Sequence, residues 1–153
     1  MGRPQRVWRR SRQRGLCVPR QVRPGFGHRQ VRAAALKGGT VKVFNKTKGL
    51  RVLGSAARAE TFETRLLGLI PRTCLGAEEG LWLEPCAMIH MCFMRFAIDA
   101  VFVDRENRVL RVIENLRPWR FSPWVAGARG VLELPSGRCA GRVEEGDELE
   151  FTP

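Results

Sequence analysis

One segment, residues 85–99 (PCAMIHMCFMRFAID), gathers more chemically active side chains than any other part of the chain. Its imidazole, His90, stands two residues before the thiol of Cys92, and the charged residues Arg95 and Asp99 follow. Side chains alternate between the two faces of an extended strand, so the even-numbered residues would point the same way. The face predicted in this way carries Met88, His90, Cys92 and Met94.

Two kinds of chemistry can be built around His90, a metal site or a thiol nucleophile, and the sequence completes neither. A His-x-Cys pair on a strand supplies two metal ligands, but no third ligand follows at a recognisable spacing. A cysteine acts as a nucleophile when a base lies beside it, and only the fold could bring Cys74, Cys86 or Cys139 to His90. The simpler alternative is a core histidine bonded to the backbone, with Cys92 packed as a small apolar residue.

Arg95 and Asp99 lie four residues apart, on one side of a strand if that strand is unbroken. Burial alone predicts an ion pair between them, because an unpaired charge in so apolar a segment would be costly. The functional alternative is an arginine fork that binds a carboxylate or a phosphate while Asp99 orients the guanidinium. Both alternatives require the two side chains to meet.

A second cluster, LRPWRFSPW at residues 116–124, places Trp119 and Trp124 beside Arg117 and Arg120 in a proline-rich segment. Loops carry a large share of binding residues, and exposed indoles next to cations are typical of a binding rim. A loop that only covers one end of a sheet would have the same composition. The segment is therefore interpreted either as a binding rim or as a lid.

The elements that must position these side chains are short strands. From Thr40 onward, apolar runs of strand length alternate with turn sequences about every ten residues, which favours a sandwich or barrel of mostly antiparallel strands. One helix is predicted over residues 61–70, where Thr61 can cap a run with a period near 3.6 that Pro71 ends. The predicted strands cover residues 40–45, 49–56, 80–85, 87–96, 98–104, 108–116, 130–135 and 147–151, and tight turns are predicted at 104–107, 135–137 and 145–147.

Length and composition set limits on the class of protein. The chain has 153 residues, of which 44% are hydrophobic, enough for one domain with a core. No apolar run reaches the roughly 18 to 20 residues of a transmembrane helix, and the first forty residues lack the apolar block of a secretion signal. Five cysteines without paired spacing favour reduced thiols, so we expect a cytoplasmic protein.

The net charge of +12 is divided unevenly along the chain. Residues 1–59 carry sixteen Lys or Arg and no acid, whereas residues 60–153 carry eleven Arg and all fifteen acids. Proline and glycine interrupt every short run in residues 1–38, so we predict a disordered extension there. Its origin is open between a phosphate-binding arm, a mitochondrial transit peptide and a translation start further along, for instance at Val41, and we favour the last.

Six stretches in this order resemble the family called domain of unknown function 192, an uncharacterised bacterial and archaeal family: TVKVFNKTKG, TRLLGLIPR, PCAMIHMCFMRFAIDAVFVD, VIENLRPWR, GARGVLELPSG and EEGDELEF. The likeness covers about residues 40–151 and implies a mainly β, jelly-roll-like sandwich without an established activity. The residues that match its most characteristic positions are His90, Phe93, Met94, Arg95, Ile98, Asp99, Trp119, Glu133, Gly137, Gly146 and Asp147.

Taken together, the sequence predicts a disordered basic extension at residues 1–38 and, at residues 39–153, a mainly β domain. We expect a jelly-roll-like antiparallel β-sandwich or barrel with one short helix. The predicted function is a non-catalytic module that binds a small molecule or a protein, without metal, cofactor or membrane. The candidate ligand-binding residues are His90, Cys92, Arg95, Asp99, Trp119, Arg120 and Trp124.

Two alternatives to a binding module remain. One is a hydrolase- or isomerase-type enzyme in which His90 acts as general base, aided by Asp99 or a cysteine. The other is nucleic-acid contact through the basic extension, which is disfavoured because residues 60–153 are net acidic. Sequence motifs for phosphate or dinucleotide binding and for a nucleophile elbow are absent.

Overall fold

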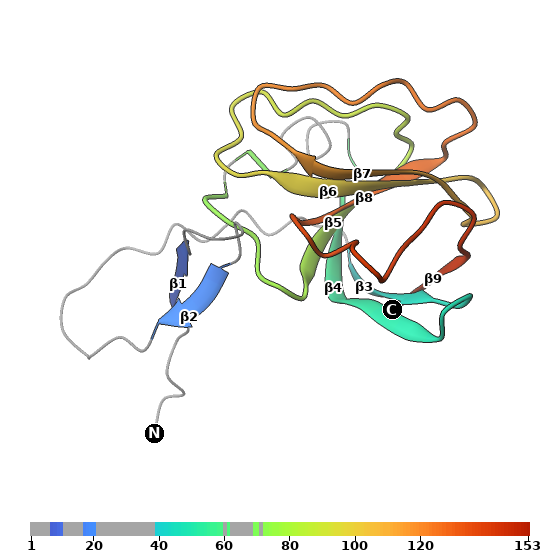
Figure 1. Cartoon of the computed structure of the whole chain (residues 1–153), viewed down its shortest axis with the longest axis horizontal. Helices are drawn as coiled ribbons and strands as arrows, with labels where there is room; N and C mark the ends of the chain where they lie inside the picture. The colour runs from blue at the N-terminus through green and yellow to red at the C-terminus, as the bar shows by residue number, and fades with distance from the viewer. Residues whose placement is uncertain (1–6, 11–16, 21–38, 60, 62–68, 71) are drawn as a thin grey trace.

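The computed structural model describes residues 7–10, 17–20, 39–59, 61, 69–70 and 72–153 (Figure 1). This part of the chain is mainly β, as predicted, and contains no helix. The helix expected over residues 61–70 falls mostly on residues 62–68, outside the described residues. The strands are β1 (Val7–Arg10), β2 (Cys17–Arg20), β3 (Thr40–Asn45), β4 (Leu50–Ala59), β5 (Glu79–Leu83), β6 (Ile98–Val103), β7 (Val109–Leu116), β8 (Gly130–Pro135) and β9 (Leu149–Thr152).

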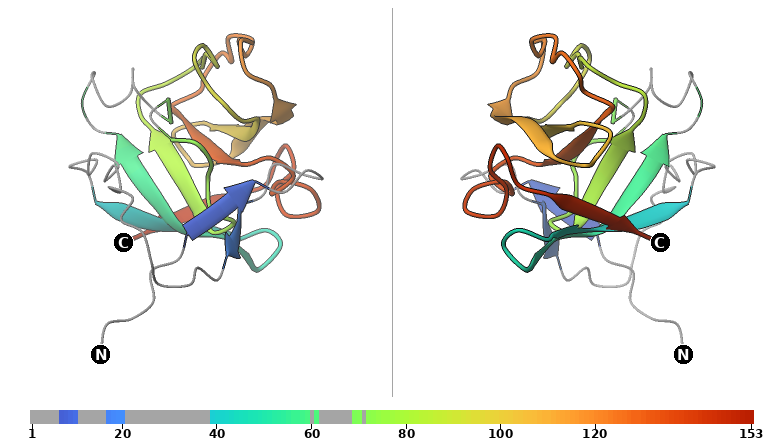
Figure 2. Two further views of the ribbon diagram at one scale, coloured as in Figure 1. Left: turned by 90° about the vertical axis from the view of Figure 1, so that its left-hand side faces the viewer. Right: turned by 90° about the vertical axis from the view of Figure 1, so that its right-hand side faces the viewer.

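Seven of these strands form one sheet in the order β7-β6-β8-β5-β4-β3-β9. All neighbours pair antiparallel except β4 and β5, which pair parallel. The sheet curls strongly into a half-barrel (Figure 2). Its two edge strands meet at one point, because Arg108 and Glu148 form an isolated antiparallel bridge just before β7 and β9.

The curled sheet has a core on each of its two faces. Every strand of the sheet contributes to the core on the concave face, where Val43, Val101 and Leu132 are fully buried. The core on the outer face is built on the middle of the sheet, from residues such as Leu81 on β5 and Phe102 on β6. Because β6 and β8 are buried along their whole length, they lie between these two cores.

Alternating apolar residues and turn chemistry correctly predicted most strands and turns. The strands predicted at residues 40–45 and 130–135 begin and end where β3 and β8 do. Asn107, Gly137 and Gly146 each have a positive φ, of 62°, 84° and 93°, in the three predicted turns. Glycine and asparagine adopt this left-handed conformation at low cost, which explains why these turns were visible in the sequence.

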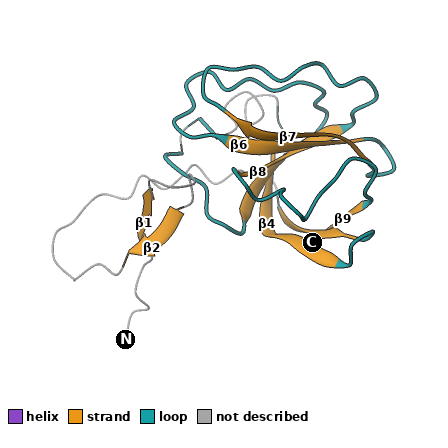
Figure 3. Cartoon of the chain, viewed as in Figure 1, coloured by secondary structure: helices purple, strands orange, loops and turns teal. Residues whose placement is uncertain are grey.

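The strand predicted over residues 87–96 is wrong. This segment is a loop between β5 and β6 (Figure 3), with a single isolated bridge between His90 and Phe121. Alternation fails because the chain turns at residues 92–93, where Phe93 has a φ of 64°. As a result Met88 is exposed and Met94 is buried, so they do not share a face with His90 and Cys92.

Within residues 1–38, which we expected to lack ordered structure, the structure describes only β1 and β2. These two strands pair antiparallel with each other, from Val7 opposite Arg20 to Arg10 opposite Cys17. They form a two-stranded sheet that is separate from the seven-stranded one. Across the described residues, no helix is long and apolar enough to cross a bilayer.

Candidate functional site

Two long loops, residues 86–97 and 117–129, run side by side above β6 and β7 (Figure 1). We call them the paired loops. They are joined along their length by backbone hydrogen bonds, so each satisfies the polar groups of the other as a strand would. The bonds run from Cys86 N to Arg129 O (3.1 Å), Val125 N to Ala87 O (2.9 Å), Ser122 N to Ile89 O (2.9 Å), Met91 N to Arg120 O (2.8 Å) and Trp119 N to Met91 O (2.9 Å).

The inner side of the paired loops covers the core on the outer face of the sheet. Ile89, Met91 and Phe96 are at most 5% exposed and pack in that core with residues of β5, β6 and β8. Their burial holds the loops against the sheet through the hydrophobic effect. The paired loops are therefore a layer of the fold with a fixed place.

The outer side of the paired loops carries large apolar side chains that remain exposed. All five of the exposed large hydrophobic side chains among the described residues lie here. Phe93 and Trp119 pack edge to face with ring centroids 5.0 Å apart, and both have a φ of 64°. Isolated surface hydrophobic residues are ordinary, whereas a group of them indicates an interaction site. The five are Met88, Phe93, Trp119, Phe121 and Trp124.

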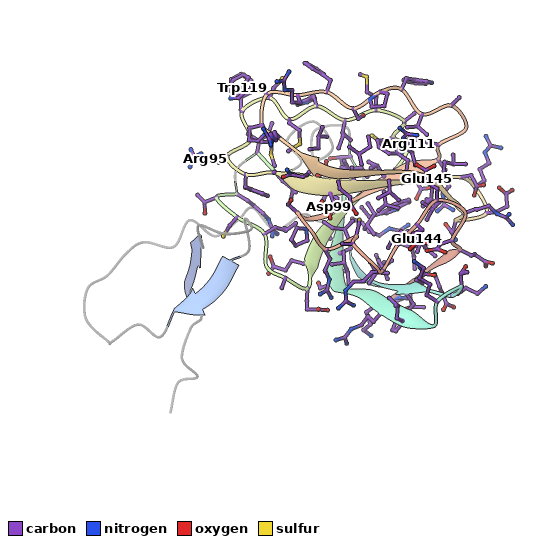
Figure 4. All side chains as sticks on the ribbon, viewed as in Figure 1. Arg95, Asp99, Arg111, Trp119, Glu144 and Glu145 are labelled. Atoms are coloured by element: carbon purple, nitrogen blue, oxygen red, sulfur yellow. The ribbon has the colours of Figure 1, made fainter. Side chains whose placement is uncertain are left out.

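The paired loops are also basic, unlike the rest of residues 60–153. They contain four arginines and no acid, while the rest of residues 60–153 contains seven arginines and fifteen acids. Arg95, Arg117 and Arg120 are exposed. Arg95 and Trp119 lie at the same end of the molecule (Figure 4). Exposed aromatic and cationic side chains thus share one surface.

Asp99 does not belong to this surface, which corrects the predicted contact with Arg95. Asp99 is fully buried in β6, whereas Arg95 is exposed. Its two carboxylate oxygens accept backbone hydrogen bonds from Asn115 N (2.9 Å) and Cys139 N (2.9 Å). Those bonds tie β6 to the end of β7 and to the loop after β8. Asp99 therefore has a structural role, and neither the ion pair nor the arginine fork forms with it.

His90 lies half-buried between the two sides of the paired loops. Its ring packs near that of Phe121, with centroids 6.4 Å apart. Its Nδ1 atom is buried and has no hydrogen-bond partner among the described residues. Of the two partners predicted for His90 in the acid–base alternative, Asp99 has both oxygens engaged with the backbone.

Glu133 is a buried acid that the candidate residues did not include. It stands on β8 opposite Leu81 of β5 and Ala100 of β6, and both neighbours belong to the core on the outer face. Glu133 is 5% exposed, and burial alone raises the pKa of its carboxyl to about 8. The signal in the sequence was a carboxylate inside the apolar run GVLELP, where a buried strand has no place for a charge.

Two of the five cysteines are poorly suited to act as nucleophiles. Cys74 is disulfide-bonded, which corrects the expectation that all five cysteines are reduced. Cys139 is fully buried, and burial together with the nearby Asp99 carboxylate raises the pKa of its thiol far above the ordinary value. A thiol that stays protonated is a poor nucleophile. Among the described residues, no group of three or more His, Cys, Asp or Glu side chains is arranged to hold a metal ion.

The structure thus brings together part of the predicted site. His90, Arg95, Trp119 and Arg120 all lie on the paired loops, as do Cys92 and Trp124. Trp119 and Trp124 are 61% and 71% exposed. The sequence did not reveal the exposure of Met88 and Phe93, because their apolar neighbours suggested a buried strand.

Comparison with known proteins identifies relatives of the whole β domain. The family model DUF192, described as an uncharacterized ACR, matches residues 43–151. A UPF0127 protein of Thermococcus sibiricus is 35% identical over 114 residues, covering 71% of this chain and 73% of that protein. A UPF0127 protein of Pyrococcus furiosus is 35% identical over 113 residues, covering 71% of this chain and 97% of that protein.

A solved structure has the same fold. The crystal structure of a protein of unknown function from Novosphingobium aromaticivorans matches with a TM-score of 0.64 at 29% identity. The match covers 72% of this chain and 83% of that chain. These two archaeal sequences and this bacterial structure confirm the resemblance seen in the sequence, and their names assign no activity.

Proposed function

This chain belongs to the DUF192 family, and we propose that its paired loops form a non-catalytic binding surface for an acidic segment of a partner protein. The observation that carries the proposal is that every exposed large hydrophobic side chain of the described residues lies on these two loops. Exposed apolar side chains gathered in one place and rimmed by polar residues mark interaction sites.

The charges around these side chains support an acidic partner. Arg95, Arg117 and Arg120 are exposed, and within the described part of the chain none of the three forms an ion pair. Their guanidinium groups are therefore available to carboxylates of another molecule. Because the rest of the domain is acidic, a partner's carboxylates would be attracted to the paired loops and repelled elsewhere.

The shape of the surface supports a protein segment over a small molecule. A small ligand needs a concave site that encloses most of its area. The aromatic rings of Phe93, Trp119, Phe121 and Trp124 instead stand between 61% and 71% exposed on the outside of the loops. Aromatic and arginine side chains are enriched at the centres of protein interfaces, and the Phe93–Trp119 pair is already fixed before any partner arrives.

The proposal is tested with a defined acidic polypeptide. We expect a fluorescein-labelled random copolymer of glutamate and tyrosine to bind the full chain in fluorescence anisotropy, more weakly as salt increases. Arg95→Ala and Trp119→Ala should each weaken binding by about tenfold or more. Arg111→Ala is the matched control, because Arg111 is an exposed arginine on β7 that pairs with Glu145 and lies far from Arg95 and Trp119 (Figure 4).

Three results would overturn the proposal. The first is no binding of the copolymer at micromolar protein. The second is an equal loss in Arg111→Ala and Arg95→Ala, which would reduce the interaction to net charge. The third is binding of anionic phosphatidylglycerol vesicles in place of the copolymer, which would assign the surface to lipid. Thermal unfolding of each variant shows whether the fold is kept.

A further inference from the structure

A small hollow opens at the mouth of the curled sheet, on the side of the concave face. Its volume is about 190 Å³. This is below the roughly 300 to 1,000 Å³ of sites for drug-sized ligands, so only a compact molecule would fit. The residues that matter for its chemistry are Arg58, Trp82, Asn107, Arg129 and Phe151.

Two aromatic rings make one wall of the hollow. Trp82 and Phe151 lie with ring centroids 4.5 Å apart, and Trp82 is 2% exposed. The Arg129 guanidinium stacks over the Trp82 ring at 5.9 Å, and the Trp82 indole N–H donates to Glu84 (3.1 Å). Because these contacts fix the indole in place, the wall is preorganised.

The two arginines that line the hollow differ in the hydrogen bonds that they donate. Arg129 is engaged on all three nitrogens: Nε and Nη2 donate to Glu84 at 2.5 and 3.1 Å, and Nη1 donates to Asn107 at 3.3 Å. This pairing lowers the pKa of Glu84 below its ordinary value, so the carboxylate stays charged. Arg58 only approaches Glu84, with 3.7 Å between Nη2 and the carboxylate. Its side chain donates no hydrogen bond to any described residue.

Arg58 is directed to the aromatic wall by the sheet itself. It stands directly opposite Trp82 in the parallel ladder of β4 and β5, so both side chains leave the same face. The hollow therefore combines a fixed apolar wall with one guanidinium whose donors are still available. A nearby negative charge on Glu84 would disfavour a dianion such as phosphate.

We infer that this hollow binds a small organic monocarboxylate, whose carboxylate pairs with Arg58 and whose apolar part lies against Trp82 and Phe151. The fork of an arginine matches a carboxylate in geometry, and a short apolar body uses the aromatic wall. The inference is independent of the proposed function, because of the residues used here only Arg129 belongs to the paired loops.

Benzoate is a suitable probe, with two comparison molecules that each lack one of its features. Benzamide keeps the ring without the charge, and inorganic phosphate keeps the charge without the ring. We expect benzoate to bind the full chain in calorimetric titration at millimolar concentration and to shift the NMR signals of the Trp82 indole N–H and the Asn107 side-chain amide. Benzamide and phosphate should bind about tenfold more weakly or not at all.

Two variants test the role of the guanidinium. Arg58→Gln should weaken benzoate binding by about tenfold, the value of a charged hydrogen-bonded contact. Arg111→Gln is closely matched, since Arg111 approaches Glu145 at 3.6 Å much as Arg58 approaches Glu84 at 3.7 Å, and it should bind benzoate as the parent chain does. Phe151→Leu removes part of the ring wall and should also weaken binding.

The inference is overturned if benzoate does not bind, if benzamide or phosphate binds as tightly, or if Arg58→Gln binds benzoate unchanged. It is also overturned if benzoate shifts signals of the paired loops and leaves Trp82 unaffected. Arg58 is 41% exposed, so its replacement is compatible with a folded chain, which thermal unfolding verifies.

Discussion

Asp99 and Glu133 are buried acids on neighbouring strands, yet their carboxyl groups have different surroundings on the two faces of the sheet. Asp99 of β6 is opposite Leu134 and Glu133 is opposite Ala100, so the two acids are adjacent in the ladder and point to opposite faces. Asp99 faces the concave side and has both oxygens bonded to backbone N–H groups. Glu133 faces the outer side, where burial alone sets the state of its carboxyl.

The difference separates a buried acid whose oxygens are both hydrogen-bonded to the backbone from one whose pKa is raised by burial alone. On the concave face the Asp99 carboxylate joins β6 to the end of β7 and to the loop after β8. The Asp147 carboxylate stabilises the last turn in a similar way, because it accepts hydrogen bonds from Glu144 N and from the Asn45 side-chain amide. On the outer face, burial raises the pKa of the Glu133 carboxyl, and the buried Nδ1 atom of His90 has no hydrogen-bond partner among the described residues. Proteins keep such costs mainly where binding or chemistry requires them.

The largest expected effect is the loss of Asp99. Asp99→Ala leaves two backbone N–H groups without an acceptor, and each uncompensated group costs about 1 to 3 kcal/mol. We expect the free energy of unfolding to fall by roughly 3 kcal/mol or more in urea denaturation. Asp104→Ala is the control, because Asp104 also accepts two backbone bonds but at an exposed turn, where water replaces it. Equal losses in the two variants would contradict a special role for the concave face.

Replacing Glu133 should raise the free energy of unfolding, whereas replacing Asp99 should lower it. The folded chain holds its proton up to about pH 8, while the unfolded chain loses it near 4.5. The contribution of Glu133 to the free energy of unfolding is therefore largest below pH 4.5, falls as the pH rises to 8, and stays constant above pH 8. Glu133→Gln removes the decline, and we expect a gain on the order of 2 kcal/mol at pH 8 and almost none at pH 4. Unfolding curves across this range measure it, and a gain independent of pH would contradict the assignment.

Trp119 provides a smaller effect on stability. Its ring is 61% exposed, so Trp119→Ala should cost less than about 1 kcal/mol in thermal or chemical unfolding. By contrast, Phe102→Ala in the core beneath should cost about 3 to 5 kcal/mol. A loss in Trp119→Ala close to that of Phe102→Ala would mean that the indole is a structural lid and not part of a binding surface.

The smallest expected effect is a difference in reactivity between two thiols, which chemical labelling measures. Cys92 is half-buried on the paired loops, whereas the Cys139 thiol is buried and its pKa is strongly raised. We expect iodoacetamide at pH 8 to modify Cys92 in the folded chain and Cys139 only after unfolding. Peptide mass spectrometry after timed quenching gives both rates. Similar rates for the two cysteines would contradict the contrast between the faces.

Local patterns predicted the fold better than they predicted the site. The alternation in TVKVFN and the apolar run GVLELP gave β3 and β8 because side-chain periodicity and turn residues are local properties. Residues 87–96 were misassigned because their hydrogen-bond partners lie in the other paired loop, about thirty positions away. Apolar composition alone cannot distinguish such a loop from a strand.

The partner of Asp99 was equally inaccessible to sequence reasoning. Arg95 is four residues away, but the groups that bind Asp99 are the backbone of Asn115 and Cys139, which only the fold brings near. Glu133, in contrast, carried a readable signal, because a lone carboxylate inside a buried strand must be neutral or functional. A carboxylate inside an apolar run is thus a signal that the sequence carries locally, whereas the partners of Asp99 are not.

The contact between Arg108 and Glu148 has a consequence for self-association. Where the first and last strands of a sheet touch, fewer backbone groups stay open to a strand from another molecule. The described residues include five exposed large hydrophobic side chains, and an open sheet edge beside them would favour aggregation. The contact between the two edge strands therefore limits strand-to-strand association, while the apolar side chains of the paired loops stay exposed.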